Sequence, residues 1–543
     1  GGGVAQQTPG PSDVANQTSR PSCALAGHAN PRSARVADPM DAAPSRRPVR
    51  LRLLRATGIS LAILGAALAL RCAHAFRDRS PGYAVRVSVS SEKSRAEPRP
   101  LRAGFARERI NPRLGDPARP VYLAGFSQNR PATGIHDDLW SVACVIDDGH
   151  TRVGFVSLDA IGLFHDDVVE IRRRLGPELG LAYTVVAATH NHSTPDLMGL
   201  WGPHPLRSGI DPDYREQVIA TAARTLAVAV ADLAQARVAF HEIPVPPEGL
   251  VADTRRPQVF DADVRVMHFT APSGGATLGT LVTWGNHPET PWSRNTEITA
   301  DFCGVLRDTL ERGASGPAGN LAGLGGVHCF INGAVGGLMT THPSTTVRDP
   351  LLGAEITEPS HAKSTAVGRQ LAARILPRLR EPAAAADHAP IGIEARTLEL
   401  PVDNVNFLIA PVLGIMDRGH SRWRHVRSEA AVLRFGDATI ACVPGEIYPE
   451  IVNGGVERAP GGDFDVDPVE VPPVRAFLAG RVKFVLGLAN DEVGYIIPRS
   501  EWDRAPPYLY GSAKSVYGEV NSLGPETAPR LHATLRELSD ALR

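Results

Sequence analysis

The sequence predicts an α/β fold in which mixed β-sheets are layered with helices. Short apolar runs rich in β-branched residues, typical of buried strands, recur along the chain and end in polar turns. Helical patterns separate these runs, at 166–175, 214–234 and 362–376. The pair Gly436-Asp437 lies between two such runs and predicts a β-hairpin. The expected strands are 141–146, 153–158, 183–188, 277–284, 327–331, 430–435, 438–443 and 483–488, and a C-terminal helix is expected from 526.

Composition is that of a soluble globular protein. The chain has 543 residues, of which 43% are hydrophobic and 21% charged, with a formal net charge of -1. This balance gives no electrostatic basis for binding nucleic acid. None of the six cysteines forms a Cys-x-x-Cys pair, so we expect small buried hydrophobes rather than a cysteine zinc site. A disulfide stays open as an alternative if the protein is exported.

The N-terminal part of the chain has the organisation of an export leader. Residues 1–39 are Gly-, Pro-, Ser- and Ala-rich and are expected to be disordered. Residues 40–75 hold several arginines, an apolar run at 58–70 and an Ala73-His74-Ala75 cleavage pattern. They are either a signal peptide or an N-terminal membrane anchor, and both place the protein in the periplasm or outside the cell. Residues 76–100 are expected to be a linker, and 101–543 the main folded domain, with a subdomain boundary near 382–390.

One strand end carries the densest group of chemically useful side chains. The apolar run 183–188 is followed by Thr189-His190-Asn191-His192-Ser193. His-x-His offers neutral nitrogen ligands of the kind that zinc prefers. In an extended segment, residues two apart share a face, so both rings can point into one pocket.

Four further strand ends carry a similar group: His287, Asn332, Glu446 and Tyr495. Ligands of α/β sheets bind outside the carboxyl ends of the strands, so loops far apart in sequence can converge there. Two histidines and one glutamate form a familiar catalytic zinc set. Each residue also has a structural alternative: a capped turn for His287, a surface carboxylate for Glu446 and a core aromatic for Tyr495.

With these residues in view, the chain resembles the neutral/alkaline non-lysosomal ceramidases from about Ala103 to Leu531. These are zinc-dependent amidases that cleave the acyl amide of ceramide. The most specific match is Thr189-His190-Asn191-His192-Ser193, which resembles the family's Thr-His-Thr-His-Ser. The other matching segments are Leu123-Ala124-Gly125-Phe126, Gly134-Ile135-His136, His287 with Asn295 and Asp301, Pro444-Gly445-Glu446, Gly487-Leu488-Ala489-Asn490 with Gly494-Tyr495, and Tyr517-Gly518-Glu519 with Gly524-Pro525.

The resemblance implies roles for these residues. The Zn²⁺ ligands would be His190, His287, Glu446 and Tyr495. The residues His192 and Tyr517 would act in proton transfer and in stabilising the oxyanion. An active-site arginine would be Arg255, with Arg256 as an equal candidate. Substrate contacts would come from Asn332, Met339 and Thr340.

The resemblance fails at one informative position. Met339 lies where the family has an active-site serine. A thioether cannot donate a hydrogen bond and offers no nucleophilic hydroxyl. Thr340 and Thr341 are the candidate substitute donors. The chain is also expected to lack the C-terminal β-sandwich domain that the family often carries.

These observations predict an exported, ceramidase-like zinc hydrolase that cleaves an amide, for example of an N-acyl sphingolipid, or an ester. The expected partners are a small-molecule or lipid substrate and, through the anchor, a membrane surface. The alternative is a non-catalytic, zinc-containing envelope protein that binds lipid or glycan. A third hypothesis is phosphoester hydrolysis with two metal ions, which would need more carboxylate ligands. Asp159 and Asp196 are the only candidates for them.

Overall fold

A computed structural model describes residues 47–515 and 517–543. The chain divides into two compact units, Gly1–Gly65 and Ala66–Arg543. The expected disorder of residues 1–39 falls outside the described part, as does Cys23. Within the described part, the cysteines Cys72, Cys144, Cys303, Cys329 and Cys442 carry free thiols.

Helix α1 (Arg47–Ala75) covers the described part of the expected leader and crosses the boundary between the two units. Its segment Leu53–Ala75 is long and apolar enough to cross a membrane, and a signal sequence has the same properties. The helix continues through the Ala73-His74-Ala75 pattern, and Ala75 itself is buried. The choice between a cleaved signal and an anchor therefore stays a prediction.

Three mixed β-sheets form the second unit. The first has the order β6-β5-β4-β2-β7, the second β1-β19-β20-β21-β23 and the third β15-β11-β10-β8. In chain order these strands are β1 (Arg86–Val89), β2 (Arg102–Arg109), β4 (Trp140–Asp147), β5 (Arg152–Leu158), β6 (Tyr183–Ala188), β7 (Ala234–Gln235), β8 (Arg237–Ile243), β10 (Val264–Thr270), β11 (Thr277–Trp284), β15 (Val327–Asn332), β19 (Ile391–Pro401), β20 (His425–Phe435), β21 (Ala438–Cys442) and β23 (Val482–Leu486).

Each sheet contains one parallel pair among otherwise antiparallel strands. The parallel pairs are β5/β6, β11/β15 and β21/β23. The predicted hairpin is confirmed, since β20 and β21 pair antiparallel around Gly436-Asp437, with Phe435 opposite Ala438. The predicted α/β class with mixed sheets is therefore correct.

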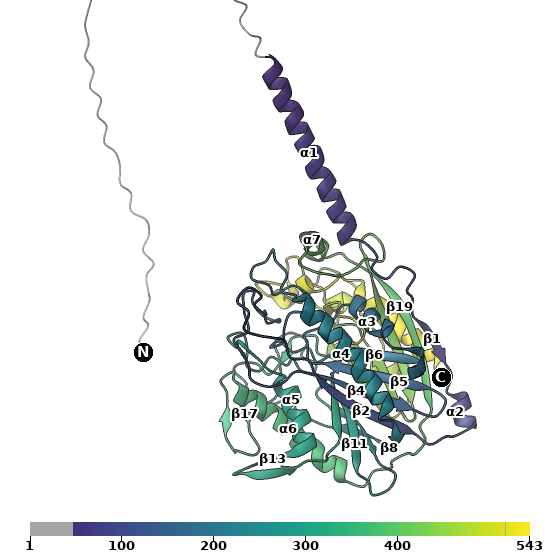
Figure 1. Ribbon diagram of the computed structural model, residues 1–543. Helices are drawn as coiled ribbons and strands as arrows, with labels where there is room; N and C mark the ends of the chain where they lie inside the picture. Colours follow the sequence, from purple (N-terminus) through teal and green to yellow (C-terminus); the bar gives the residue numbers. More distant parts are fainter. Residues whose placement is uncertain (1–46, 516) are drawn as a thin grey trace, which may run out of the picture. The chain divides into compact units, whose positions relative to one another are not determined.

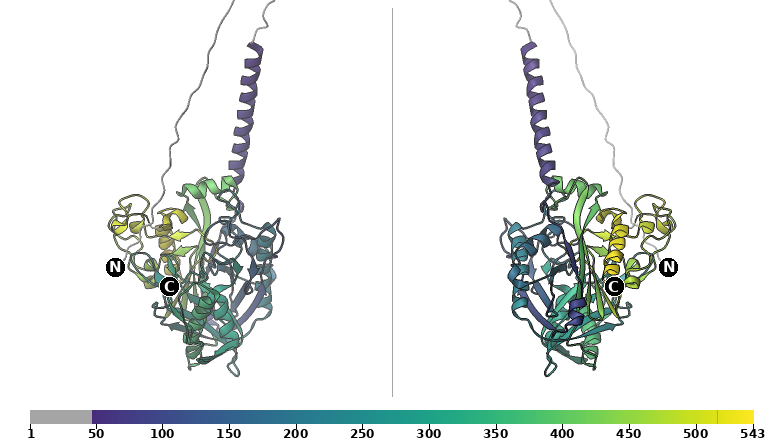
Figure 2. Two further views of the ribbon diagram at one scale, coloured as in Figure 1. Left: turned by 90° about the vertical axis from the view of Figure 1, so that its left-hand side faces the viewer. Right: turned by 90° about the vertical axis from the view of Figure 1, so that its right-hand side faces the viewer.

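The inner faces of the three sheets share one apolar core, and helices cover the outer faces. The shared core includes Phe155, Phe269, Cys329, Leu433 and Phe484, which are buried strand residues from all three sheets. The main covering helices are α3 (His165–Arg173), α4 (Pro212–Ala231), α5 (Asp301–Arg312), α6 (His361–Arg380) and α10 (Thr527–Ala541). Figure 1 shows α4 across β2, β4 and β5, and Figure 2 shows α10 in yellow against the green strands β19 and β20.

Short elements complete the unit. They are α2 (Glu92–Ala96), α7 (Val405–Leu413), α8 (Pro449–Asn453), α9 (Val474–Phe477) and the two-stranded ladders β3 (Gly134–Ile135) with β12 (Glu297–Ile298), β9 (Ala252–Asp253) with β16 (Met339–Thr340), β13 (Gly313–Gly316) with β14 (Gly319–Ala322), β17 (Val347–Arg348) with β18 (Glu355–Ile356), and β22 (Glu446–Ile447) with β24 (Tyr495–Ile496).

Residues 76–100 differ from the expected linker. They contain β1, which pairs with β19, and Val85, Val87 and Val89 pack against the shared core. The alternation of valine with Arg86 and Ser88 places the apolar side chains on one face of the edge strand. Residues 382–390, the expected subdomain boundary, lie inside the second unit.

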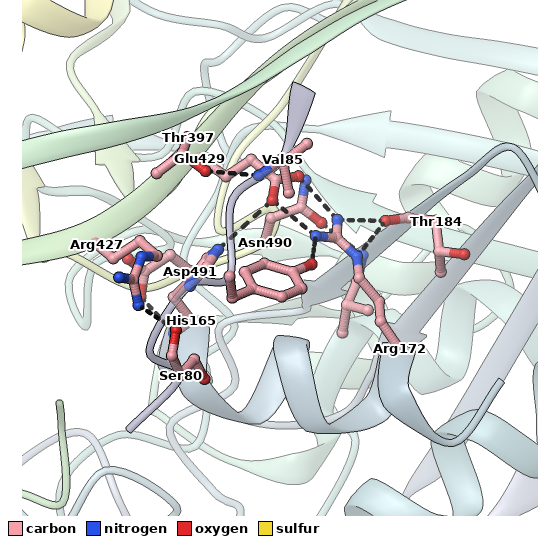
Figure 3. A network of polar contacts seen from close by, with 12 residues as sticks. Ser80, Val85, His165, Arg172, Thr184, Thr397, Arg427, Glu429, Asn490 and Asp491 are labelled. Carbon is pink, nitrogen blue, oxygen red and sulfur yellow. Dashed lines mark hydrogen bonds and ion pairs between the residues drawn. The ribbon is translucent and has the colours of Figure 1, made fainter. Parts of the chain in front are cut away.

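A buried polar network links the first two sheets (Figure 3). Glu429 on β20 is fully buried and accepts two hydrogen bonds from Arg172 on α3, at 2.7 and 2.8 Å. The Tyr183 hydroxyl on β6 also donates to Glu429 and accepts from Asn490 Nδ2 at 3.0 Å. Asn490 in turn accepts from the Val186 amide at 2.9 Å. The network thus fixes the strand β6 and the loop after β23 relative to each other.

We expect the Glu429–Arg172 pair to make the free energy of unfolding depend on pH below about 4.5. Burial raises the pKa of Glu429, but Arg172 contributes to a larger shift in the opposite direction. The resulting pKa is about 2. A depressed folded-state pKa stabilises the protein above the unfolded value of about 4.5, and this stability is lost as pH falls toward 2. Glu429→Gln leaves Arg172 without its charge partner and should cost about 3 kcal/mol near pH 7.

The difference in unfolding free energy between Glu429→Gln and the parent protein should therefore shrink between pH 4.5 and pH 2. Urea unfolding at several pH values measures it. Glu381→Gln, at an exposed glutamate, is the matched control. A difference that stays constant over this pH range would contradict the prediction.

Candidate metal centre

The carboxyl ends of the three parallel strand pairs meet at one place. His190 follows β6, and His287 follows β11. Glu446 and Tyr495 follow β21 and β23 and lie opposite each other as Cα partners in the short parallel ladder β22/β24. The structure thus brings together the four residues that the resemblance implies as ligands.

His190 is held by backbone on one side and faces a carboxylate on the other. Its ring Nδ1 lies 2.8 Å from the Ile161 carbonyl oxygen. Its Nε2 lies 3.2 Å from Glu446 Oε2. The backbone of His190 has φ of 67°, a left-handed conformation that is uncommon outside glycine and often found at functional sites. This turn directs the ring into the site.

His287 has the same arrangement. Its Nδ1 lies 2.6 Å from the Met339 carbonyl oxygen, and its backbone amide donates to the same oxygen at 3.1 Å. Its Nε2 lies 3.0 Å from Glu446 Oε2. Burial raises the pKa of Glu446, but the two histidines outweigh burial and hold that pKa well below its usual range. One carboxylate oxygen therefore faces two imidazole nitrogens.

His192 completes a cluster of three buried rings. Its ring centroid lies 5.0 Å from that of His190 and 5.5 Å from that of His287. Its Nδ1 lies 3.1 Å from Glu289 Oε2. Burial lowers the pKa of His192 to about 4 despite the opposing effect of Glu289. The pKa of Glu289 lies at about 2, because His192 and His287 outweigh the opposing effect of burial.

Two tyrosines lie beside the histidines. The Tyr495 and Tyr517 hydroxyl oxygens are 3.0 Å apart. Tyr495 is buried, whereas Tyr517 is half-exposed. Burial raises the pKa of Tyr517 well above its usual range, and the charge of Glu446 adds to this shift. The Tyr517 hydroxyl is therefore protonated and able to donate a hydrogen bond.

Most of the side chains described so far line a cavity of about 180 Å³. The polar lining consists of His190, His192, Glu446, Glu492, Tyr495 and Tyr517 together with Arg418, His420 and Asn521. Apolar side chains form most of the remaining wall, among them Phe126, Ile161, Phe164, Met198, Leu200, Trp201, Val402, Phe407, Pro411 and Met416. A largely apolar pocket with a few convergent polar groups is the usual form of a small-molecule site.

The buried donors fit a metal ion. The three histidines each offer a ring nitrogen, and these nitrogens lie within 4.8 Å of one another. The Nε2 atom of His192 is buried without a hydrogen-bond partner. The Nδ1 atoms of His190 and His287 are occupied by carbonyl oxygens, the outer contact that orients ligating histidines. Nitrogen and carboxylate donors in this combination suit zinc.

Arg255 lies outside this site. Its buried guanidinium pairs with Glu450 and with Glu501 at 3.0 Å, and it stacks over Tyr448. Among the described residues it is not part of the cavity lining. The structure therefore does not bring Arg255 to the histidines. Its guanidinium belongs instead to a buried ion-pair network with Glu450 and Glu501.

The three residues predicted to contact substrate are not part of the cavity lining. They contact the backbone or lie beside residues around the site. Asn332 uses its amide to bind the Thr189 and Asn286 carbonyl oxygens, at 3.0 and 2.9 Å. Met339 orients His287 through its carbonyl oxygen, while its side chain lies in the apolar core between sheet and helices. Thr340 lies beside His287 in a parallel bridge.

Two glutamates of the site were not predicted. Glu289 contacts His192. It lies only two residues after His287, and this spacing was the sequence signal that could have placed it in the site. Glu492 lines the cavity, and burial together with the charge of Glu446 raises its pKa well above the usual range. Its Oε1 accepts from the Gly494 amide at 2.7 Å.

The two carboxylates considered for a second metal are engaged elsewhere. Asp159 pairs with buried Arg307 at 2.6 Å. Asp196 accepts from the backbone amides of Met198, Gly199 and Trp201. Neither joins the histidines, so the described residues do not favour the two-metal reading.

Comparisons with known proteins support the fold. No family model and no curated protein matches the chain. A solved neutral ceramidase from Pseudomonas aeruginosa is similar, with a TM-score of 0.59 and 16% identity over 82% of this chain and 74% of that one. A structure described as ceramidase complexed with C2 gives the same TM-score and identity over 82% and 75% of the two chains. The chain shares the fold of neutral ceramidases. At this identity, the likeness concerns the fold alone.

A close backbone approach at Gly125 positions His192, and this can be tested. Gly125 has φ of 102°, and a Cβ there would lie 2.4 Å from His192 Cγ. We expect Gly125→Ala to push the His192 ring against the neighbouring rings of His190 and His287 and to weaken zinc affinity by roughly 10–100-fold, as disturbing metal ligands typically does, whereas removing the ring would crowd neither histidine. A competition titration against a chelator measures this affinity.

Gly275→Ala is the matched control, because Gly275 also has a positive φ, of 65°, and has open space around it. Both variants carry the backbone cost of a left-handed alanine. Equal zinc affinity in the two variants would show that the contact with His192 has no effect.

Proposed function

We propose that the chain is an exported, zinc-dependent hydrolase of the ceramidase-like family that cleaves the amide bond of an N-acyl lipid. The observation that carries this proposal is the convergence of His190 and His287 on Glu446, where His190 and Glu446 line a largely apolar cavity within a ceramidase fold. The apolar wall suits an acyl chain, and the polar lining suits the scissile carbonyl group.

In this proposal His190, His287, Glu446 and Tyr495 hold the metal. Zinc held there would polarise a carbonyl group and lower the pKa of a water molecule toward 7. Tyr495 lies next to Glu446 in the β22/β24 register, which supports its place in the set. His192 is the alternative fourth ligand, because its ring nitrogen lies with those of the other two histidines.

We assign His192 to proton transfer, with Glu289 as the residue that positions it. The contact of 3.1 Å between the Glu289 carboxylate and His192 Nδ1 leaves Nε2 to exchange a proton with the substrate. A carboxylate behind an imidazole fixes its tautomer and orientation in this way. Tyr517, with its protonated hydroxyl, is assigned to stabilise the oxyanion.

The alternative function is a non-catalytic, zinc-containing envelope protein that binds lipid or glycan. It is favoured by the Met339 position, because that side chain is buried in the core and brings no hydroxyl to the cavity. Both functions use the same cavity and metal ligands, and they differ in whether an amide is cleaved.

Metal content tests the ligand set. We expect roughly stoichiometric zinc in the purified protein and its loss in His190→Ala and His287→Ala, because each variant removes a nitrogen donor. His192→Ala should keep the zinc and lose hydrolysis of an N-acyl lipid. Mass spectrometry of the metal and a fatty-acid release assay measure these two quantities.

His268→Ala is the control for removing a buried histidine, since His268 lies on β10 and bonds Thr277. A parent protein without zinc after chelator-free purification and zinc addition would contradict the proposal. Loss of zinc in His192→Ala would assign His192 to the metal. Zinc without hydrolysis of any amide or ester would favour the binding protein.

The role of Tyr517 gives a second test. We expect Tyr517→Phe to lower kcat by roughly 10²–10³-fold while zinc content is unchanged, because one oxyanion donor is lost. Tyr510→Phe is the control, since the Tyr510 hydroxyl bonds Glu457 and is not part of the cavity lining. Unchanged kcat in Tyr517→Phe would remove this residue from the mechanism.

A further inference from the structure

The helix α7 has two apolar faces with different surroundings. On one side, Phe407 and Pro411 line the cavity. On the other side, Val405, Ile409 and Leu413 are about half-exposed, at 55%, 48% and 48%. They are spaced four residues apart, so they form one stripe along the helix. An exposed apolar stripe of this kind marks an interaction surface.

The C-terminal end of α7 is bonded to the candidate membrane span. Arg71 of α1 donates to the Val412 and Pro411 carbonyl oxygens, at 2.7 and 3.3 Å. Both partners belong to the unit that begins at Ala66, and Figure 1 draws α7 beside the lower end of α1. Arg71 lies four residues before Ala75, where the candidate span ends, which corresponds to about 6 Å of helix.

A second segment lies at the same level. Trp423 is 65% exposed and stacks edge-on against Phe76, the residue after the span, with ring centroids 4.8 Å apart. The exposed residues Arg422 and Arg424 flank it. Tryptophan favours the boundary between lipid and water, and arginine beside it can reach the lipid headgroups. This pattern is typical of a surface that contacts lipid.

We propose that α7 and Trp423 lie in the surface of the bilayer that α1 spans, and that a lipid enters the cavity past α7. Three observations carry it: the apolar stripe, the bond of α7 to the span, and the Trp423 contact at the end of the span. The inner face of α7 already lines the cavity, so the same helix connects the bilayer with the site. The bilayer contact itself is independent of the reaction, and only the identity of the entering molecule rests on the proposed function.

Insertion of α7 can be measured directly on the full chain in lipid nanodiscs. An environment-sensitive fluorophore is attached to Ile409→Cys, in a background with Cys23→Ser and Cys72→Ser. The four remaining cysteines are buried. An interfacial helix lies about 5–10 Å into the boundary of headgroups and acyl chains, so lipids with a nitroxide near the headgroup should quench the fluorophore at least about twofold.

Leu352→Cys is the matched label, since Leu352 is 51% exposed and lies near β17, which Figure 1 draws away from α7. It should not be quenched. Absence of quenching at 409 would overturn the proposal. A fluorophore at 409 that is shielded from water without being quenched would indicate a protein partner and would also overturn it.

A second variant separates this inference from the proposed function. Ile409→Asp places a charge on the stripe, and Ile409 does not line the cavity. We expect it to lower hydrolysis of an N-acyl lipid embedded in the bilayer by about tenfold or more, and to leave hydrolysis of a water-soluble short-chain amide unchanged. Equal rates for parent and variant on the embedded lipid would contradict the proposal. If neither substrate is cleaved by the parent protein, the proposed function fails and the quenching experiment still decides the bilayer contact.

Discussion

The site depends on one buried carboxylate oxygen that faces two imidazoles. Glu446 Oε2 lies 3.2 Å from His190 Nε2 and 3.0 Å from His287 Nε2. A charge buried beside an apolar cavity is costly unless it is paired. The folded protein therefore has to place all three side chains in contact. They come from three different sheets, which explains why each sheet contributes a parallel strand pair that ends at this point. The shared core between the sheets keeps these ends in register.

The fold and the convergence of His190, His287 and Glu446 were predictable because they depend on local patterns. Apolar runs gave β6 and β11 with their observed bounds, and the glycine-aspartate pair gave the hairpin between β20 and β21. Strand ends are where α/β proteins bind ligands, so His190, His287 and Glu446 could be grouped from position alone. The two additional glutamates of the site could not be predicted from strand positions. Glu289 and Glu492 join the site only through contacts that the fold creates.

Arg255 and Met339 show the limits of assigning roles through a resemblance. Arg255 resembles an active-site arginine in its sequence context, yet Glu450 and Glu501 bind its guanidinium inside the protein. The sequence cannot reveal such pairing, because the partners are about 200 and 250 residues away along the chain. Met339 contributes its backbone oxygen to His287, a function that does not depend on the side chain. A serine at this position could make the same backbone contact, so the substitution changes the core and leaves the orientation of His287 intact.

The N-terminal segment connects the question of cleavage with the integrity of the site. A cut after Ala75 would remove Arg71, which bonds the end of α7, and α7 lines the cavity through Phe407 and Pro411. The residues just beyond the cut are also packed, because Phe76 contacts His420 and Trp423. Whether α1 is cleaved therefore decides whether this wall of the cavity keeps its bond to Arg71.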